Sequence, residues 1–290
     1  MKRTLIVFLS TVFLWSCGRF EKKAEKQESG DERIVSLAKQ YTELLYALGV
    51  ADHLVAVDLS STYPPETAEL TTVGYHRALS AEGVMAVDPT LILHDHNIGP
   101  EHVVTQLEQL KAPLHAFENN GKSWEGTLDL IDEMSVYFDV ETTGDSLRKV
   151  MTLEMNQLMS SLESTVDTPE VLVIHFGRAT NTYLVMTSNS TGAKMIEIAG
   201  GKVPFIGKGG MRPLSPEVFA EMNPDIILMT NFGYDRLNGE EAILELPGVR
   251  NTKAAQNHRI YRIEEHDLVY FGPRTPQNIR LIRSFIEDEA

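Results

Sequence analysis

The chain of 290 residues carries 41 acidic and 26 basic side chains, which gives a formal net charge of −15. Because no cluster of Lys and Arg lies outside the extreme N-terminus, a nucleic-acid partner is not expected. An apolar fraction of 42% is enough for one large core or two ordinary cores. The single cysteine excludes an internal disulfide framework and any multi-cysteine zinc or iron–sulfur site.

The N-terminal segment has the pattern of a targeting signal. A positively charged start is followed by an apolar run from Leu5 to Trp15, too short to span a bilayer, and then by Cys17. The pattern resembles a bacterial lipoprotein signal at residues 1–16, in which Cys17 becomes the lipidated first residue of the mature protein. Trp15 stands where a small residue is usual, so an ordinary secretory signal is the alternative. Residues 17–32 are charged and nearly devoid of apolar side chains, which predicts a flexible tether.

Helix and strand patterns alternate through residues 33–138, which predicts an N-terminal α/β lobe. Short apolar runs predict strands and amphipathic stretches predict helices. The expected strands lie at 34–37, 54–57, 91–93 and 114–117, and the expected helices at 41–48, 102–110 and 124–138.

One segment of this lobe is repeated later in the chain. Residues 74–93, GYHRALSAEGVMAVDPTLIL, recur without a gap at 209–228 as GGMRPLSPEVFAEMNPDIIL. In each copy a serine, Ser80 or Ser215, can cap a helix, a proline ends that helix, and an apolar run typical of a buried parallel strand follows. The repeat predicts two related halves, and the space between two such halves suits a ligand.

Residues 142–164 contain no proline and place apolar side chains mostly at helical spacing. A helix of about 20 residues is roughly 30 Å long, so we expect a rigid helix within residues 139–165 to join the lobes. A C-terminal α/β lobe is expected over residues 166–290, beginning with a strand at 171–174 that leads into His175. Its other expected strands lie at 226–228 and 259–263, and its helices at 193–198, 240–244 and 276–286.

The chain lacks the short motifs of the large enzyme classes. No nucleophile elbow, Walker A loop, H-E-x-x-H or kinase motif set is present. His94, His96 and His102 have a spacing that would suit zinc or manganese if a carboxylate converged on them, with His94 and His96 on one strand face. A hydrolase using this cluster lacks a general base and a fourth ligand, so no enzymatic activity is expected. A surface lipoprotein without any ligand is a further alternative.

Four parts of the sequence together resemble the haem-binding substrate-binding proteins of bacterial ABC importers, a class III group of periplasmic-binding-protein-like proteins. They are Val73–Gly83, the helix at 142–164, Pro213–Glu217 and Phe271–Pro276, and the resemblance covers residues 33–290. It implies two Rossmann-like α/β lobes joined by a single long helix, with ferric haem as the transported ligand in the cleft between them. It also implies delivery to a membrane permease and its ATPase, and a location in the cell envelope, facing the periplasm.

The same resemblance implies an iron ligand, Tyr75, which matches the tyrosine of the family's G-Y-x-R-x-L-S-A-E-G segment. A phenolate is a hard anionic ligand suited to ferric iron. An unperturbed phenol is neutral at pH 7, so a nearby cation must favour the phenolate. In a strand-like segment Arg77 would share the face of Tyr75 and supply that charge, whereas His76 would point away. His175 is the candidate for a second axial ligand.

The remaining site residues concern the haem carboxylates, the permease and other cargo. Arg178, Arg212 and Arg274 are candidates to pair with haem propionates, since guanidinium matches a carboxylate, although Arg274 is expected rather to brace a turn. Glu82 and Glu217 match the family's permease-docking positions, and both also suit the first turn of a helix. A ferric siderophore, a corrinoid, or a zinc or manganese ion is the alternative cargo for the same fold.

Overall fold

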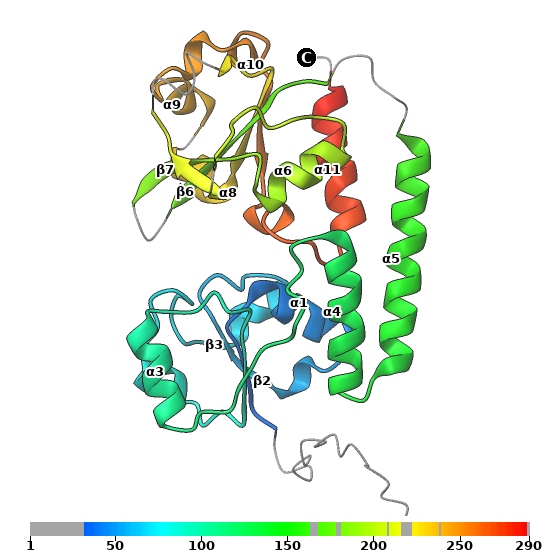
Figure 1. Ribbon diagram of the computed structural model, residues 1–290. Helices are drawn as coiled ribbons and strands as arrows, with labels where there is room; N and C mark the ends of the chain where they lie inside the picture. The colour runs from blue at the N-terminus through cyan, green and yellow to red at the C-terminus, as the bar shows by residue number, and fades with distance from the viewer. Residues whose placement is uncertain are drawn as a thin grey trace, which may run out of the picture. The chain divides into compact units, whose positions relative to one another are not determined.

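The computed structural model describes residues 32–162, 168–177, 181–207, 209–215, 222–237 and 239–288. Over this part the chain forms two α/β lobes, each with its own sheet and cores (Figure 1). The proposed signal at 1–16, the lipidation residue Cys17 and the tether up to residue 31 lie outside the described residues. No described helix combines the length and the apolar character that crossing a membrane requires.

The sheet of the N-terminal lobe has five strands in the order β3-β2-β1-β4-β5, and all four pairings are parallel. Its strands are β1 (Ile34–Ser36), β2 (Leu54–Val57), β3 (Thr71–Thr72), β4 (Leu91–Leu93) and β5 (Leu114–His115). β1 lies at the centre, where Ile34 pairs with both Leu54 and Leu91. This parallel arrangement explains why β1 and β4 are buried along their whole length, and apolar except for Ser36, instead of alternating.

Successive residues of β1 enter the two cores that lie on opposite faces of this sheet. Ile34 packs in a core with α1 and α4, whereas Val35 packs in a second core with α2 and α3. The helices are α1 (Lys39–Ala47), α2 (Ala81–Met85), α3 (Glu101–Gln109) and α4 (Trp124–Tyr137), with 3-10 turns at Ala51–His53 and Pro65–Glu69. Side-chain oxygens cap two of them, because Ser80 accepts from the backbone N–H of Gly83 and Ser123 from that of Gly126.

The sheet of the C-terminal lobe is mixed, in the order β10-β9-β6-β7-β8. Its strands are β6 (Val171–Gly177), β7 (Thr182–Met186), β8 (Met211–Pro213), β9 (Ile226–Thr230) and β10 (Ile260–Ile263). β6, β9 and β10 are parallel, but β7 is antiparallel to both β6 and β8. The helices are α6 (Thr191–Ile198), α8 (Asn231–Leu237), α9 (Glu240–Leu244), α10 (Lys253–Gln256) and α11 (Thr275–Glu287), with 3-10 turns at Val249–Asn251 and η4 (Glu265–Asp267). The strands β7 and β8 were not predicted from the sequence.

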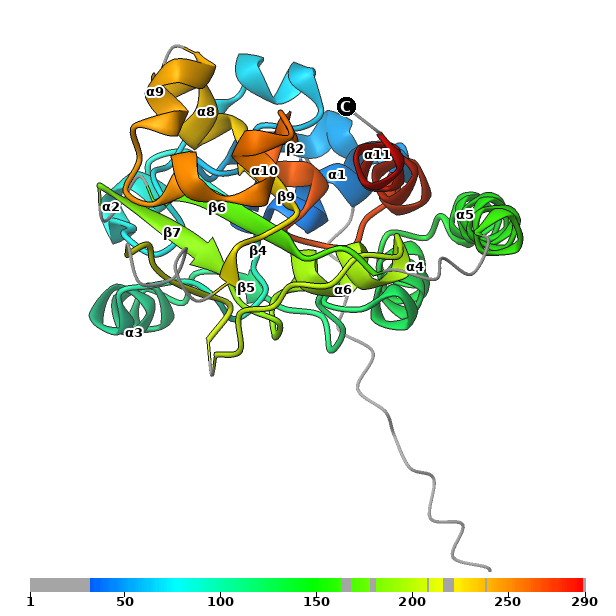
Figure 2. The same ribbon diagram turned by 90° about the horizontal axis from the view of Figure 1, so that it is seen from above.

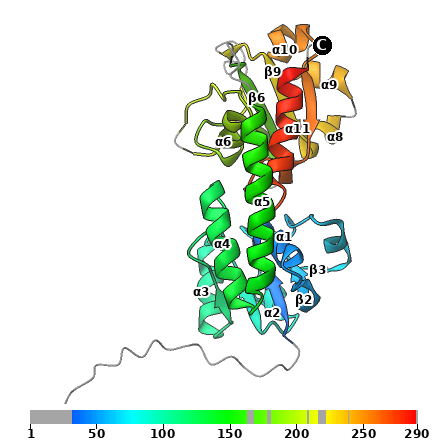
Figure 3. The same cartoon turned by 90° about the vertical axis from the view of Figure 1, so that its right-hand side faces the viewer.

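A single long helix, α5 (Glu141–Ser161), joins the two lobes, as expected. It runs beside α4 along one lobe and beside α11 along the other (Figure 3), and it lies at the outer edge of the molecule (Figure 2). Met151 belongs to the core of the N-terminal lobe, whereas Met155 and Leu158 belong to that of the C-terminal lobe. α5 approaches α4 closely at Gly144, where a Cβ would lie 2.5 Å from the Cβ of Ser135.

The two copies of the sequence repeat share their buried strand but differ at their start. β4 and β9 occupy the matching ends of the two copies, and both are completely buried. In the first copy Gly74 has a φ of 101°, and the N–H of Ala78 donates to the carbonyl of Tyr75, which closes a turn. In the second copy the corresponding residues Met211–Pro213 form β8. The predicted helix start at Pro216 and Glu217 lies outside the described residues.

Candidate functional site

The carboxyl ends of the parallel strands in the two lobes face each other. Lys39 begins the helix that follows β1, and Glu265 begins the turn that follows β10. Their side chains form an ion pair across the two lobes, with Nζ 2.8 Å from Oε1, and both are largely buried. Because ligands of open α/β sheets bind beyond the carboxyl ends of strands, these facing edges are the candidate site.

Tyr75 lies at this edge of the N-terminal lobe, on the turn after β3, and is half-buried. Its ring centroid is 4.4 Å from that of His76, with an angle of 56° between the ring planes. The expectation that His76 points away from Tyr75 is therefore wrong. It assumed an extended segment, whereas the bond from Ala78 to Tyr75 closes a turn here.

His76 is buried against the carboxylate of Asp58, the residue that follows β2. The Nδ1 atom of His76 lies 2.8 Å from Oδ2 of Asp58, and the hydroxyls of Ser60 and Ser61 each donate to this carboxylate at 2.6 Å. Burial opposes ionisation of Asp58, but the hydrogen bonds from His76, Ser60 and Ser61 outweigh it and lower its pKa. Asp58 is therefore a buried carboxylate anion bonded to the histidine whose ring lies beside Tyr75.

Arg77 is exposed and donates from Nε to Oδ1 of Asn97 at 3.0 Å. The turn that brings His76 to Tyr75 also removes the basis for placing Arg77 on the face of Tyr75, because that placement required alternation along a strand. The same amide group of Asn97 also contacts His76, because its Nδ2 lies 3.4 Å from Nε2 of the imidazole. Asn97, like Asp58, was not among the residues singled out from the sequence.

His175 lies near the carboxyl end of β6 in the C-terminal lobe; it was expected just past a strand ending at residue 174, but β6 extends to Gly177. Its Nδ1 is 3.0 Å from the hydroxyl of Thr230 at the end of β9, and its ring packs edge-on to Phe232. Burial lowers the pKa of His175, and the positive charge of Lys39 adds to this, against the opposing effect of Glu265. A neutral imidazole, which is the form that ligates metals, is thereby favoured.

A buried polar cluster connects the two lobes beside this edge. Arg274, at the start of α11, donates to Glu43 of α1 at 2.8 Å and to Asp267 of η4 at 2.5 Å. The hydroxyl of Tyr270 also donates to Glu43 at 2.5 Å, and the guanidinium carbon of Arg274 lies 3.6 Å from the centroid of the Tyr63 ring. Arg274 thus pairs with one carboxylate from each lobe, whereas the sequence analysis expected it to brace a turn. No pattern in the sequence indicated Glu43, whose partner Arg274 lies 231 residues away.

The histidines after β4 do not form a complete metal site. The rings of His94 and His96 meet edge-on with centroids 5.4 Å apart, and the φ of 65° at His96 shows that they lie on a bend and not on one strand face. Burial lowers the pKa of His94 to about 4, with a further contribution from His96. His102 is exposed on α3. Among the residues that the structure describes, no group of three or more His, Cys, Asp or Glu could hold a metal ion.

The other predicted residues are placed as follows. Glu82 is exposed in the first turn of α2. Arg212 is exposed on β8, and its guanidinium carbon lies 4.8 Å from the centroid of the Phe205 ring. Arg178 and Glu217 lie outside the described residues.

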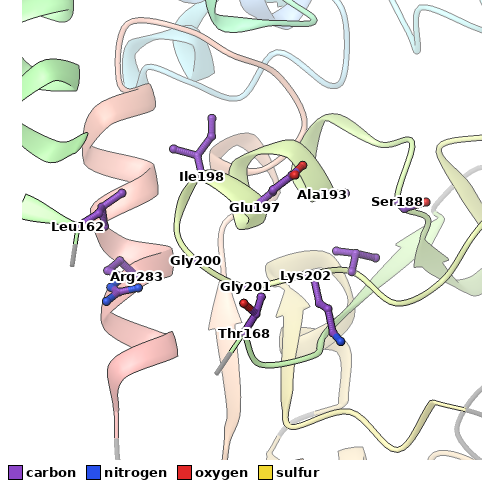
Figure 4. Close-up of a pocket in the computed structure, with 11 residues that line it drawn as sticks. Leu162, Thr168, Ser188, Ala193, Glu197, Ile198, Gly200, Gly201, Lys202 and Arg283 are labelled. Atoms are coloured by element: carbon purple, nitrogen blue, oxygen red, sulfur yellow. The ribbon is translucent and has the colours of Figure 1, made fainter. Parts of the chain in front are cut away.

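A cavity of about 540 Å³ lies in the C-terminal lobe, away from these residues, between α6 and α11 (Figure 4). Its lining includes Glu197, Lys202 and Arg283, and none of the residues predicted to bind ligand lines it. Leu162 and Thr168 also line it, and residues 163–167 between them lie outside the described part of the chain. The cavity is therefore not part of the candidate site.

Comparison with known proteins gives a consistent family. Residues 34–266 match the model of the periplasmic binding protein family. The chain is similar to the periplasmic heme-binding protein RhuT from Roseiflexus sp. RS-1 in its apo form, with a TM-score of 0.79 and 32% identity over 88% of this chain and 98% of that one. It is 23% identical to the vitamin B12-binding protein of Vibrio parahaemolyticus over 76% of this chain and 78% of the relative.

A third relative is the uncharacterized ABC transporter substrate-binding lipoprotein YvrC of Bacillus subtilis. It is 24% identical over 86% of this chain and 77% of its own length. Two α/β lobes joined by one long helix, together with the match over residues 34–266, establish that the chain belongs to the periplasmic binding protein family, as a class III substrate-binding protein of an ABC transporter.

Proposed function

We propose that the protein captures ferric haem between its lobes, with Tyr75 as the iron ligand, and delivers it to the permease and ATPase of an ABC transporter. The observation that carries the proposal is the placement of Tyr75 on a hydrogen-bonded turn at the sheet edge that faces the other lobe. The likeness to a heme-binding protein at 32% identity over 88% of the chain supports haem as the cargo. A phenolate oxygen is an established axial ligand of haem iron.

His175 is the proposed second axial ligand, from the opposite lobe. Its lowered pKa supplies the neutral imidazole that a ferric ion requires. Arg77, Arg178 and Arg212 are proposed to interact with the phenolate or the haem propionates, because a planar guanidinium pairs well with carboxylates.

The membrane partners are proposed to meet other parts of the chain. Glu82 is exposed at the start of α2, where the carboxylate is accessible to an arginine of the permease, and Glu217 is its proposed counterpart in the second repeat copy. Cys17 is the proposed point of lipid attachment, which would keep the protein at the membrane while residues up to 32 act as a tether.

A corrinoid is the second candidate, because a vitamin B12-binding protein matches 76% of this chain. A corrinoid carries amide side chains in place of the two haem propionates, so it would not need the arginines as carboxylate partners. Cobalt would also not require the phenolate of Tyr75. The two cargoes therefore predict different effects of changing this tyrosine.

The experiment is a side-by-side titration of the purified protein with hemin, cyanocobalamin, a ferric siderophore, zinc and manganese. Haem capture predicts a visible charge-transfer spectrum typical of tyrosinate-bound ferric haem, and its sharp weakening in Tyr75→Phe. Tyr261→Phe is the matched control, since Tyr261 is a half-buried tyrosine of the C-terminal lobe bonded to Asp288. Saturable binding of cyanocobalamin without hemin binding would replace haem by the corrinoid.

A further inference from the structure

A directional hydrogen-bond chain runs from the interior of the N-terminal lobe to the exposed Arg77. We propose that Asp58, His76 and Asn97 form a positioning chain that holds the side chains of Tyr75 and Arg77 in the orientation in which they bind ligand. The role of these hydrogen bonds in ligand binding rests on the proposed function of Tyr75, whereas the hydrogen bonds themselves are present in the free protein.

The chain begins at a fixed acceptor. The carboxylate of Asp58 has a side-chain exposure of 0% and accepts from the hydroxyls of Ser60 and Ser61 and from the backbone N–H of Ser60. An ionised carboxylate is only an acceptor, so Nδ1 of His76, at 2.8 Å, must carry a proton and donate to it. Asp58 therefore fixes both the orientation of the imidazole ring and the position of its proton.

The direction of each later bond follows from this one. The group that faces Nε2 of His76 at 3.4 Å is Nδ2 of Asn97, which can only donate, so Nε2 is the acceptor of this contact. The Oδ1 of Asn97 consequently points the other way and accepts from Nε of Arg77 at 3.0 Å. Each of the three contacts that link Arg77, Asn97, His76 and Asp58 thus joins one donor to one acceptor.

The backbone does not need this chain in order to form the turn. The N–H groups of Val73, Ala78 and Gly99 donate to the carbonyls of Val57, Tyr75 and His76. Two further bonds run from Leu59 to Gly74 and from Leu79 to Gly99. Burying a histidine and a carboxylate costs free energy that an apolar side chain would not. The polar chain therefore has a task other than shaping the main chain.

The second copy of the repeat shows which task. The residue that corresponds to His76 is Met211, an apolar side chain, and the residue that corresponds to Tyr75 is Gly210. A buried histidine thus accompanies the tyrosine in one copy, and both are missing from the other. Because the imidazole ring lies 4.4 Å from the Tyr75 ring, fixing the imidazole restricts the positions that the phenol can adopt. A side chain that is already restricted loses less entropy on binding.

The primary test is Asn97→Ala, which removes the link between His76 and Arg77. His76→Phe is the second variant, because it keeps an aromatic ring beside Tyr75 but cannot donate to Asp58. Both are expected to weaken hemin binding about 10- to 100-fold, as is usual for residues that orient a metal ligand, and to shift the charge-transfer band. The control is His53→Gln, at an exposed histidine in a 3-10 turn. Thermal unfolding midpoints of all variants report whether they remain folded.

A measurement on the ligand-free protein tests the hydrogen-bond chain independently of the proposal that the ligand is haem. Nitrogen-15 NMR of the ligand-free protein should show His76 protonated at Nδ1 and a slowly exchanging Nε–H of Arg77, assigned with Arg77→Lys and lost in Asn97→Ala. An Arg77 signal unaffected by Asn97→Ala would overturn the chain. So would hemin affinity and spectrum equal to wild type in both folded variants. Wild-type protein that binds no hemin would refute the haem proposal. The NMR result would still show whether the hydrogen-bond chain exists in the ligand-free protein.

Discussion

The carboxylate of Glu43 receives two hydrogen bonds from the C-terminal lobe, from Arg274 and Tyr270, and its removal tests how much these contacts stabilise the protein. Glu43 is 4% exposed and accepts from Nε of Arg274 at 2.8 Å and from the Tyr270 hydroxyl at 2.5 Å. Glu43→Gln keeps the shape of the side chain but replaces one acceptor oxygen by an NH₂ donor. That donor must then face either the guanidinium of Arg274 or the hydroxyl of Tyr270, which would have to turn its proton away from residue 43, toward Nδ1 of His266 at 3.1 Å.

The expected cost follows from these contacts. A hydrogen bond to a charged group contributes about 1.5–3 kcal/mol, and breaking a buried ion pair by removing one charge costs roughly 3–5 kcal/mol. Arg274 keeps its second partner, Asp267, so the loss should be smaller than that of an isolated pair. We therefore expect a decrease of about 2–4 kcal/mol in the free energy of unfolding, which corresponds to a drop of roughly 5–15 °C in the unfolding midpoint for a chain of this size.

The assay is thermal and urea unfolding followed by circular dichroism, with Glu287→Gln as the matched control. Glu287 also pairs with an arginine, Arg283 at 2.6 Å, but its side chain is 57% exposed. An exposed pair of this kind contributes only about 0.2–1 kcal/mol. Equal losses in the two variants, or a loss below about 1 kcal/mol in Glu43→Gln, would refute the inference that the buried contacts of Glu43 stabilise the protein.

Three further predictions test other parts of the molecule. His175→Ala should change the coordination of bound hemin and so its visible spectrum, with less loss of affinity than Tyr75→Phe; an unchanged spectrum removes His175 as a ligand. Burial lowers the pKa of both His94 and His266 from 6.5 to about 4. The unfolded chain therefore binds protons at a higher pH than the folded chain, so the free energy of unfolding should fall as the pH falls from about 6.5 to about 4. An unfolding midpoint that does not change over this range would contradict the prediction. Gly144→Ala should lower the free energy of unfolding by about 1–3 kcal/mol, because the new Cβ forces α4 and α5 apart. The measurement is urea unfolding, with Gly209→Ala as the control, where the nearest atom to the new Cβ is 3.8 Å away. Equal stabilities of the two variants would show that the helices adjust freely.

Local sequence signals predicted the elements that depend on local chemistry. The helix from Trp124 was placed correctly because its sequence is amphipathic, and the structure adds a cap by Ser123. The helix that joins the lobes was predicted because no proline interrupts residues 142–164. β2 was found at its observed bounds because the run Leu54–Val57 is apolar and lies between turns. β7 and β8 were missed because their short, partly exposed runs lack a continuous apolar pattern, and their pairing depends on neighbours in the folded sheet.

The candidate site was predicted only where one residue carries the signal. Tyr75 was singled out through the family resemblance and His175 through its position after an apolar run, and the structure places Tyr75 on the turn after β3 and His175 within β6. The prediction that His76 points away from Tyr75 was wrong because it assumed an extended strand. The hydrogen bond from the N–H of Ala78 to the carbonyl of Tyr75 closes a turn there instead. The partners of Glu43 could not be found, since a contact across 231 residues leaves no periodic trace in one sequence.

The placement of Met151, Met155 and Leu158 on one helix has a consequence for how the protein loses its structure. These side chains lie within about two helical turns of one another, yet Met151 belongs to one core and the other two to the second core. Melting either lobe would therefore fray the helix on which the other lobe packs. The two lobes should unfold as one cooperative unit, in a single transition, although each has its own sheet.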